Sequence, residues 1–147
     1  MIRTIIIDDE QSNREILSSM LQDHFPKADI VGEADSVESG LEAIRQHSPD
    51  LVLLDIRMGD GEGFDILKQL GTIDFKVIFV TAFEEYALKA IKFSALDYLL
   101  KPVSLPELRS AMDKAETQII KDLNVQLAEL NTNLQAINNK LIVLRTA

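Results

Sequence analysis

Two short stretches of the sequence decide the fold. Residues 2–10 read IRTIIIDDE, and residues 51–58 read LVLLDIRM. In each stretch an unbroken run of isoleucine, leucine or valine ends directly at an aspartate. Short continuous apolar runs are typical of strands covered on both faces, as in parallel sheets. We therefore expect two buried strands that each present carboxylates at their carboxyl end.

Three more apolar runs continue the pattern. They cover residues 29–32, 77–80 and 96–100. Helical patterns lie between and after the runs, at about residues 12–25, 36–48, 62–70, 84–93 and from 104 onward. Strands that alternate with helical connections favour right-handed crossovers and a parallel sheet. The sequence therefore predicts a doubly wound α/β fold with a five-stranded parallel sheet.

Serine residues mark the expected starts of three helices. Ser12, with Glu15 in the capping-box position, is the predicted N-cap of the first helix. Ser36 and Ser104 are the predicted N-caps of the second and fifth helices. A serine hydroxyl is suited to this position because it accepts hydrogen bonds from the unpaired amides of the first helical turn.

The composition excludes several classes of protein. The chain has 147 residues, a net charge of −9 and no cysteine. Without cysteine there is no disulfide framework, thiolate zinc site or cysteine nucleophile. The acidic balance argues against nucleic-acid binding by this chain. No apolar run approaches the ~20 residues that span a bilayer, and the N-terminal run is too short for a secretory signal. We expect a cytoplasmic protein without membrane contact.

Asp8, Asp9 and Asp55 are predicted to form one cluster. In doubly wound sheets, ligand sites form at the carboxyl ends of the strands, where the strand order reverses. If the first and third strands are neighbours, these three side chains meet at that edge. Carboxylates so close together repel one another, and a hard divalent cation removes the conflict. The expected cofactor is Mg²⁺.

Two further polar side chains are expected at the same edge. Thr81 ends the fourth predicted strand, and Lys101 ends the fifth. A metal, a lysine and a hydroxyl around a carboxylate suit phosphoryl transfer, because they neutralise the phosphoryl oxygens while the aspartate attacks the phosphorus in line. Taken singly, such residues are usually turn formers or surface groups. Their coincidence at one edge favours a site.

These residues carry a family resemblance. The Asp8-Asp9 pair, Asp55, Thr81-Ala82 and Lys101-Pro102 resemble the receiver domain of two-component response regulators, over roughly residues 2–115. The resemblance implies a flavodoxin-like or receiver-like sheet with strand order 2-1-3-4-5. It implies a sensor histidine kinase as the partner that supplies the phosphoryl group.

Two segments narrow the resemblance further. Residues 85–90 (EYALKA) and 95–102 (ALDYLLKP) are similar to receivers of LytTR-type transcription regulators. We therefore expect a phosphoreceiver domain over residues 1–118 and a helical linker over residues 119–147. In regulators of this type a β-rich DNA-binding domain follows such a linker, so DNA binding is expected of the full-length regulator and not of this chain.

The resemblance also implies a role for each site residue. Asp55 is the phosphoacceptor and a ligand of Mg²⁺. Asp9 binds the ion directly, Asp8 binds it through water, and the backbone carbonyl of Arg57 is a further ligand. Lys101 pairs with the phosphoryl group.

Three further residues are expected to respond to phosphorylation or to shape the site. Thr81 hydrogen-bonds a phosphoryl oxygen and moves toward it. Tyr98 is the switch aromatic, which turns inward when Thr81 moves. The Lys101-Pro102 peptide bond is expected to be cis, because proline is the residue for which that isomer is cheap.

The loop after Asp55 departs from the family pattern. Gly59 follows Met58 where proline is common, and Glu62 stands where aspartate or asparagine is common before Gly63. Since glycine leaves the backbone unconstrained, we expect residues 59–61 to be more mobile than usual.

The C-terminal segment has a heptad pattern. Leucine and isoleucine recur at steps of three and four residues, at Ile120, Leu123, Leu127, Leu130, Leu134, Ile137, Leu141 and Leu144. Such a series of a and d positions is typical of a coiled coil, and it predicts a homodimer. The alternative is an amphipathic helix that packs on a neighbouring domain. Residues 141–147 could equally be the first strand of a further domain.

The face of the fourth helix, fifth strand and fifth helix is the expected output surface, which changes shape on phosphorylation and offers a second dimer contact. Tyr86, Ala90, Phe93 and Tyr98 are its predicted residues. For Phe93, core packing is an equally good interpretation.

Two other functions compete with a signalling switch. A phosphatase of the haloacid-dehalogenase type also uses an aspartate nucleophile with Mg²⁺, but it usually has a second aspartate two residues later, where this chain has Arg57. A dimerisation module that works without phosphorylation is the other. We expect a receiver that catalyses only its own phosphorylation and dephosphorylation, and not a classical enzyme.

Overall fold

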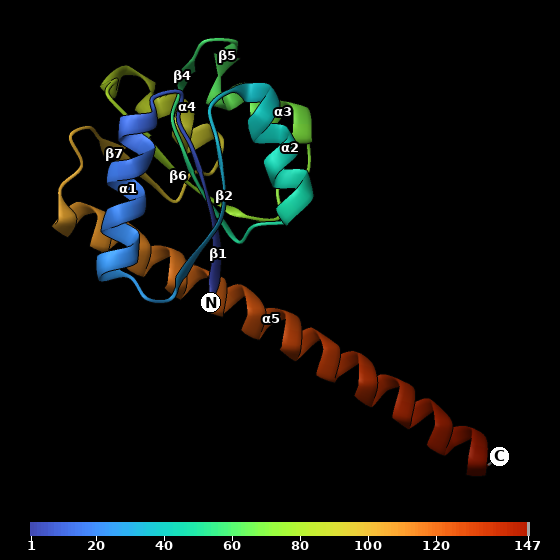
Figure 1. The fold of residues 1–147 in the computed structure, drawn as a ribbon. Helices are drawn as coiled ribbons and strands as arrows, with labels where there is room; N and C mark the ends of the chain where they lie inside the picture. Colours follow the sequence, from blue (N-terminus) through green and yellow to red (C-terminus); the bar gives the residue numbers. More distant parts are fainter. Residues whose placement is uncertain (147) are drawn as a thin grey trace. The chain divides into compact units, whose positions relative to one another are not determined.

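The computed structural model describes residues 1–146, and it describes side chains through residue 144 (Figure 1). The chain divides into two compact units, Met1–Ala115 and Glu116–Ala147. The last helix, α5 (Leu105–Thr146), begins in the first unit and forms the described part of the second. Among the described residues, no helix is both long and apolar enough to cross a membrane.

The first unit is built on a parallel sheet of five strands. The strands are β1 (Ile2–Ile7), β2 (Ala28–Ala34), β3 (Leu51–Leu54), β6 (Lys76–Thr81) and β7 (Asp97–Leu100). Their order in the sheet is β2-β1-β3-β6-β7. This confirms the predicted order 2-1-3-4-5, since β6 and β7 are the fourth and fifth strands of the prediction.

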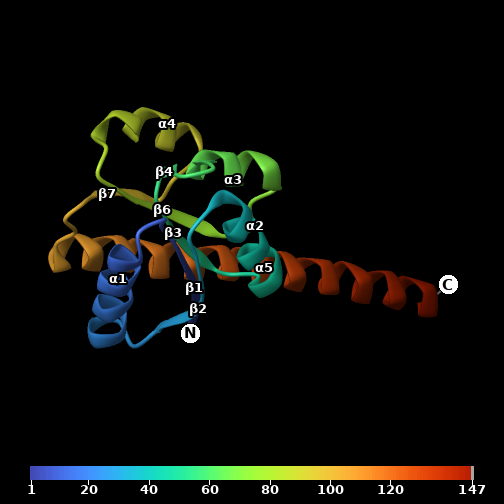
Figure 2. The same cartoon turned by 45° about the horizontal axis from the view of Figure 1, so that its top comes forward.

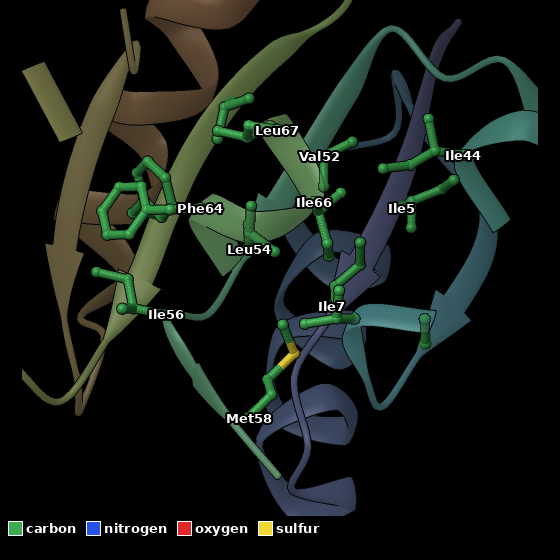
Figure 3. Packing of buried hydrophobic residues seen from close by; sticks show 14 of the residues in the cluster. Ile5, Ile7, Ile44, Val52, Leu54, Ile56, Met58, Phe64, Ile66 and Leu67 are labelled. Carbon is green, nitrogen blue, oxygen red and sulfur yellow. The ribbon is translucent and has the colours of Figure 1, made fainter. Parts of the chain in front are cut away.

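Helices cover both faces of the sheet (Figure 2). They are α1 (Gln11–His24), α2 (Val37–His47), α3 (Gly63–Leu70), the 3₁₀ turn η1 (Glu84–Tyr86), α4 (Ala87–Lys92) and α5. The core between the sheet and helices α2, α3 and α4 is lined by isoleucine, leucine, valine and phenylalanine (Figure 3). Because alternate strand residues point to opposite faces, the continuous apolar runs supply both layers.

The helix starts agree with the sequence pattern in two cases out of three. Ser36 caps α2 in a capping box with Ser39, and the Ser104 hydroxyl accepts the amide of Glu107 in the first turn of α5. The prediction for Ser12 is wrong, because Ser12 lies inside α1. The helix begins earlier because the Asp8 carboxylate accepts the amide N–H of the N-cap residue, two positions further along.

A small hairpin is the one element that the pattern did not predict. Strands β4 (Arg57–Met58) and β5 (Gly61–Glu62) pair antiparallel directly after β3. Each strand has two residues, which is too short for an alternating hydrophobic pattern. Contacts within the loop therefore determine the hairpin, and no hydrophobic pattern in the sequence indicates it.

Candidate functional site

The sheet register brings the aspartates together. Ile7 of β1 and Leu54 of β3 are paired in register, so Asp8 and Asp55 leave the sheet side by side. The Asp55 amide donates to the Ile7 carbonyl at 2.9 Å. This backbone bond fixes the start of the loop that carries Asp55.

The same edge receives Thr81 and Lys101. Thr81 of β6 pairs with Leu100 of β7, and the Lys101 amide donates to the Thr81 carbonyl at 2.9 Å. The peptide bond between Lys101 and Pro102 is cis. The predicted site residues on four strands thus reach one edge of the sheet.

Three carboxylates gather at this edge. Asp8, Asp9 and Asp55 each offer an oxygen, and these oxygens lie within 4.8 Å of one another. Asp8 and Asp55 are buried, whereas Asp9 is exposed. Mg²⁺ prefers one or two carboxylates together with waters and phosphate oxygens. A half-open cluster of this kind fits the ion, because the exposed side leaves room for ligands from solvent.

Lys101 bridges two of the carboxylates. Its Nζ donates to Asp8 Oδ2 at 2.6 Å and to Asp55 Oδ2 at 2.9 Å. The side chains of Lys101, Asp8 and Asp55 are only 17%, 2% and 8% exposed, respectively. Solvent therefore screens these ion pairs far less than it screens a surface pair. The lysine is held where added negative charge on Asp55 would lie.

Burial and charge shift the pKa values of Asp9, Asp55 and Lys101. Burial, against the opposing effect of Lys101, raises the pKa of Asp55. Burial and the neighbouring charge of Asp8 raise the pKa of Asp9. Burial by itself would lower the pKa of Lys101, but hydrogen bonds to Asp8 and Asp55 raise it. The lysine therefore stays charged and offsets part of the cost of burying the Asp55 carboxylate.

These shifts predict a pH dependence. The affinity for Mg²⁺ is expected to fall as pH drops toward the raised pKa values of Asp9 and Asp55, because protons compete with the ion. The folded, metal-free protein binds these protons more tightly than the unfolded chain does. The stability that they contribute is present below the ordinary carboxyl pKa and is lost as pH rises through the raised pKa values of Asp9 and Asp55. Calorimetric Mg²⁺ titrations from about pH 5 to 8 check the first point, and a constant affinity would contradict it.

The two expected switch residues lie next to one loop. The buried Thr81 accepts the Phe83 amide through Oγ1 at 3.4 Å. The Tyr98 hydroxyl donates to the Phe83 carbonyl, and the Tyr98 side chain is half-buried. Both residues therefore contact the backbone of the β6–η1 loop, at its amide and its carbonyl.

The side chain of Arg57 has contacts that the sequence did not predict. Its Nε donates to the Tyr86 hydroxyl at 3.0 Å, and its guanidinium lies 4.2 Å from the centre of the Phe83 ring. Glu85 lies 3.7 Å from the same guanidinium. The sequence predicts a ligand role for the backbone carbonyl of Arg57 and bulky Arg57 and Phe83 side chains beside the site, but not the contacts between them. The spacing of 26 to 29 residues between these partners follows no local pattern, so no sequence signal could have paired them.

Gly63 is required by the path of the backbone at the site. A Cβ at this position would lie 2.2 Å from the Asp55 carbonyl oxygen and 2.9 Å from Leu54 Cγ. The start of α3 therefore passes against the residue that carries the central carboxylate. The glycine at the start of α3 was visible in the sequence, but the close approach of backbone that requires it was not.

The prediction for the surface of the fourth helix, fifth strand and fifth helix is partly wrong. Ala90 is buried, and the Phe93 ring lies 5.2 Å from Phe64, so both pack in the core. The short α4 turns its inner side onto the sheet and leaves Leu88 and Ile91 exposed instead, at 77% and 70%.

The second unit is a continuous helix through Thr146. All heptad residues are exposed in the single chain, from 48% at Leu141 to 72% at Leu144. Residues 141–146 are helical here, and Ala147 lies outside the described residues.

Comparison with known proteins identifies the family. Residues 4–113 match the family model described as response regulator receiver domain. The sensory transduction protein LytT of Enterococcus faecalis is 35% identical over 138 residues, covering 92% of this chain and 57% of that protein. LytT of Bacillus subtilis is 34% identical over 143 residues, with 96% and 57% covered. The chain thus spans about half the length of these curated relatives.

Solved structures of response regulators have the same fold as this chain. The receiver domain of AraT, a response regulator from Geobacillus stearothermophilus, matches with a TM-score of 0.76 at 27% identity, covering 83% of this chain and 98% of that one. The response regulatory domain of mrkE from Klebsiella pneumoniae matches with a TM-score of 0.73 at 26% identity, with 80% and 97% covered. The fold and the match to the family model together show that this chain belongs to the receiver domains of response regulators in two-component signalling.

Proposed function

We propose that the chain is a switch that receives a phosphoryl group on Asp55 from a sensor histidine kinase, in a reaction that depends on Mg²⁺. The observation that carries the proposal is the bridge from Lys101 to Asp55 and Asp8, inside a cluster of three carboxylates. An ammonium group fixed beside one buried carboxylate offsets the charge that appears when that carboxylate is phosphorylated.

Asp9, Asp55 and the Arg57 carbonyl would hold the ion, with Asp8 acting through water. When bound, Mg²⁺ supplies positive charge to the phosphoryl oxygens. A carboxylate oxygen of Asp55 attacks the phosphorus, and its O–P bond forms as the P–N bond to the kinase histidine breaks. Lys101 stays charged throughout, because its pKa is raised.

Phosphorylation would then shift a balance between two states. The added group brings about −1.5 to −2 charge and three acceptor oxygens. Thr81 gains a phosphoryl partner and Tyr98 turns inward. Both contact the loop at Phe83, which leads into η1 and α4, so a change there reaches the exposed side of α4. The phosphoryl group biases states that exist beforehand.

Acetyl phosphate with Mg²⁺ tests the phosphoacceptor. Intact-mass measurement is expected to show one added phosphoryl group, mapped to Asp55 by peptide mass spectrometry. The label is expected to vanish in Asp55→Asn and to persist in Asp50→Asn, which carries the same charge change. A label on another residue contradicts the proposal. Repeated turnover of a phosphate ester would favour a phosphatase instead, and no label in the presence of Mg²⁺ would favour a plain dimerisation module.

We also propose that the full chain forms a homodimer through the heptad seam of α5, with a second contact on the face of α4, β7 and the start of α5. Eight large apolar side chains in an exposed stripe are costly in a monomer, and another helix with the same repeat covers them. Asn124, Asn131 and Asn138 flank the seam in successive heptads, so like charges do not oppose self-association there. DNA binding and a cytoplasmic location are proposed for the full-length regulator.

Charged residues in the seam test the dimer. The Leu130→Asp/Leu134→Asp variant is expected to be a monomer, because each carboxylate would be buried unpaired against the partner helix. Val125→Asp/Gln135→Asp, which places the same charges away from the seam, is expected to remain a dimer. Light scattering at matched concentrations checks both, with 16.5 kDa as the mass of one chain. A monomeric wild-type chain, with and without phosphorylation, contradicts the proposal.

A further inference from the structure

The turn of the β4–β5 hairpin is tied to a helix by a carboxylate that the proposed reaction does not use. Asp60 lies at the turn between the two strands. Its Oδ1 accepts the amide of Val37 at 2.8 Å, and its Oδ2 accepts the amide of Glu38 at 3.1 Å. Both amides belong to the first turn of α2, more than 20 residues away in sequence.

This contact completes the N-terminus of α2. A helix begins with amides that lack partners within the helix. Ser36 Oγ accepts the third of these, from Ser39, at 3.0 Å. Asp60 takes the first two, from Val37 and Glu38, so the amides of all three residues are satisfied. The two backbone hydrogen bonds lower the pKa of Asp60, so the carboxylate is charged at neutral pH beside the positive end of the helix.

The hairpin is held at its ends by the buried Met58 and by the Glu62 amide, which donates to Asp65 Oδ2 at 2.8 Å, and Asp60 holds the turn between them. A Cβ at Gly59 would meet no atom within 4 Å. Gly61 has a φ of 154°, in the region that favours glycine. The sequence predicts mobility for residues 59–61 on these glycines alone, and the bonds of Asp60 to α2 oppose that mobility.

The same hairpin carries the proposed carbonyl ligand. Arg57 lies opposite Glu62 in the two-stranded pairing, three residues before Asp60. On its other side Glu62 pairs with Lys89 of α4 at 3.4 Å. The position of the Arg57 carbonyl therefore depends on where the hairpin is held.

From these contacts we propose that Asp60 is a positioning residue for the metal site, which holds the β4–β5 hairpin and links Mg²⁺ binding to the first turn of α2. The proposal rests on the proposed function, since it takes the Arg57 carbonyl as a ligand. Linkage is reciprocal, so binding of the ion in turn steadies the contact between Asp60 and α2. Loss of a residue that orients a metal ligand, without binding the metal itself, typically lowers the affinity for the metal by about 10-fold or more.

Mg²⁺ titration calorimetry and amide hydrogen exchange on three variants test the proposal. Asp60→Ala removes both acceptors and is expected to weaken Mg²⁺ binding about 10-fold. Asp60→Asn keeps one acceptor oxygen, but its amide NH₂ group cannot accept the second backbone amide, so it is expected to lose less affinity than Asp60→Ala. Asp74→Ala, at an exposed position between α3 and β6, removes the same charge and is expected to bind like the wild type.

Hydrogen exchange at the α2 amides separates the loss of this contact from the mere loss of a negative charge. Mg²⁺ is expected to slow exchange at the Val37 and Glu38 amides in the wild-type chain but not in Asp60→Ala. Wild-type affinity for Mg²⁺ in Asp60→Ala would overturn the proposal, as would wild-type Val37 and Glu38 amides whose exchange does not change when Mg²⁺ binds. A wild-type chain that binds no Mg²⁺ overturns the proposed function as well, so the two failures are distinguishable.

Discussion

Gly63→Ala is expected to lower the free energy of unfolding by about 3 kcal/mol, which is a large part of the stability of a small domain. The added methyl group would overlap the Asp55 carbonyl oxygen, at 2.2 Å, and that atom belongs to the backbone and not to a flexible side chain. To remove this overlap, α3 has to move away from β3, and this movement also displaces Asp55. Urea denaturation measures the stability loss.

Gly59→Ala is the matched control. It makes the same chemical change four residues earlier, where a Cβ meets nothing within 4 Å. We expect a change within about 1 kcal/mol, toward greater stability, because alanine reduces the freedom of the unfolded chain. Equal stabilities of the two variants would show that α3 does not depend on its close approach to Asp55.

Lys101→Ala is expected to destabilise the metal-free protein by about 3 kcal/mol and to slow labelling of Asp55 by about 100-fold. The substitution leaves the buried Asp8 and Asp55 without their shared counter-charge. Because the pKa of Lys101 is raised, its stabilising effect is present below the ordinary lysine pKa and is lost only as pH rises through the folded value. Added Mg²⁺ is expected to restore more stability in the variant than in the wild type.

Lys114→Ala is the control that shows whether the stability loss is specific to Lys101 or follows the removal of any paired lysine. Lys114 also pairs with an aspartate, Asp97, at 3.0 Å, but its side chain is 52% exposed. An exposed pair contributes about 1 kcal/mol or less. Thermal unfolding with and without Mg²⁺ compares the two variants, and equal effects would contradict a special role for Lys101.

The sheet was predictable because its strands are short, continuous apolar runs. A run such as residues 51–54 has no polar face and is too short for a buried helix, which favours a strand that helices cover on both sides. Once the strands are parallel, their carboxyl ends share an edge, and Asp8, Asp55 and Lys101 follow from their places after the runs. Composition and spacing therefore predicted which residues meet.

The contacts that support the site were not predictable in the same way. Asp60 and the Arg57 side chain act through loop geometry between segments more than 20 residues apart, which leaves no periodic signal. Ser12 failed as a cap because a local hydrogen bond from the Glu10 amide to the Asp8 carboxylate places the start of α1 earlier. Ala90 failed as a surface residue because α4 is a single short helix, whose register against the sheet is set by packing of its neighbours.

A crystal structure of the chain grown with Mg²⁺ and beryllium trifluoride, a mimic of the phosphoryl group, tests the central claim most directly. We expect the mimic on the Asp55 carboxylate, within hydrogen-bond distance of Lys101 Nζ and Thr81 Oγ1. We expect the ion to be bound by Asp9, Asp55 and the Arg57 carbonyl. A mimic on another residue, or an ion held away from the three carboxylates, would contradict the account.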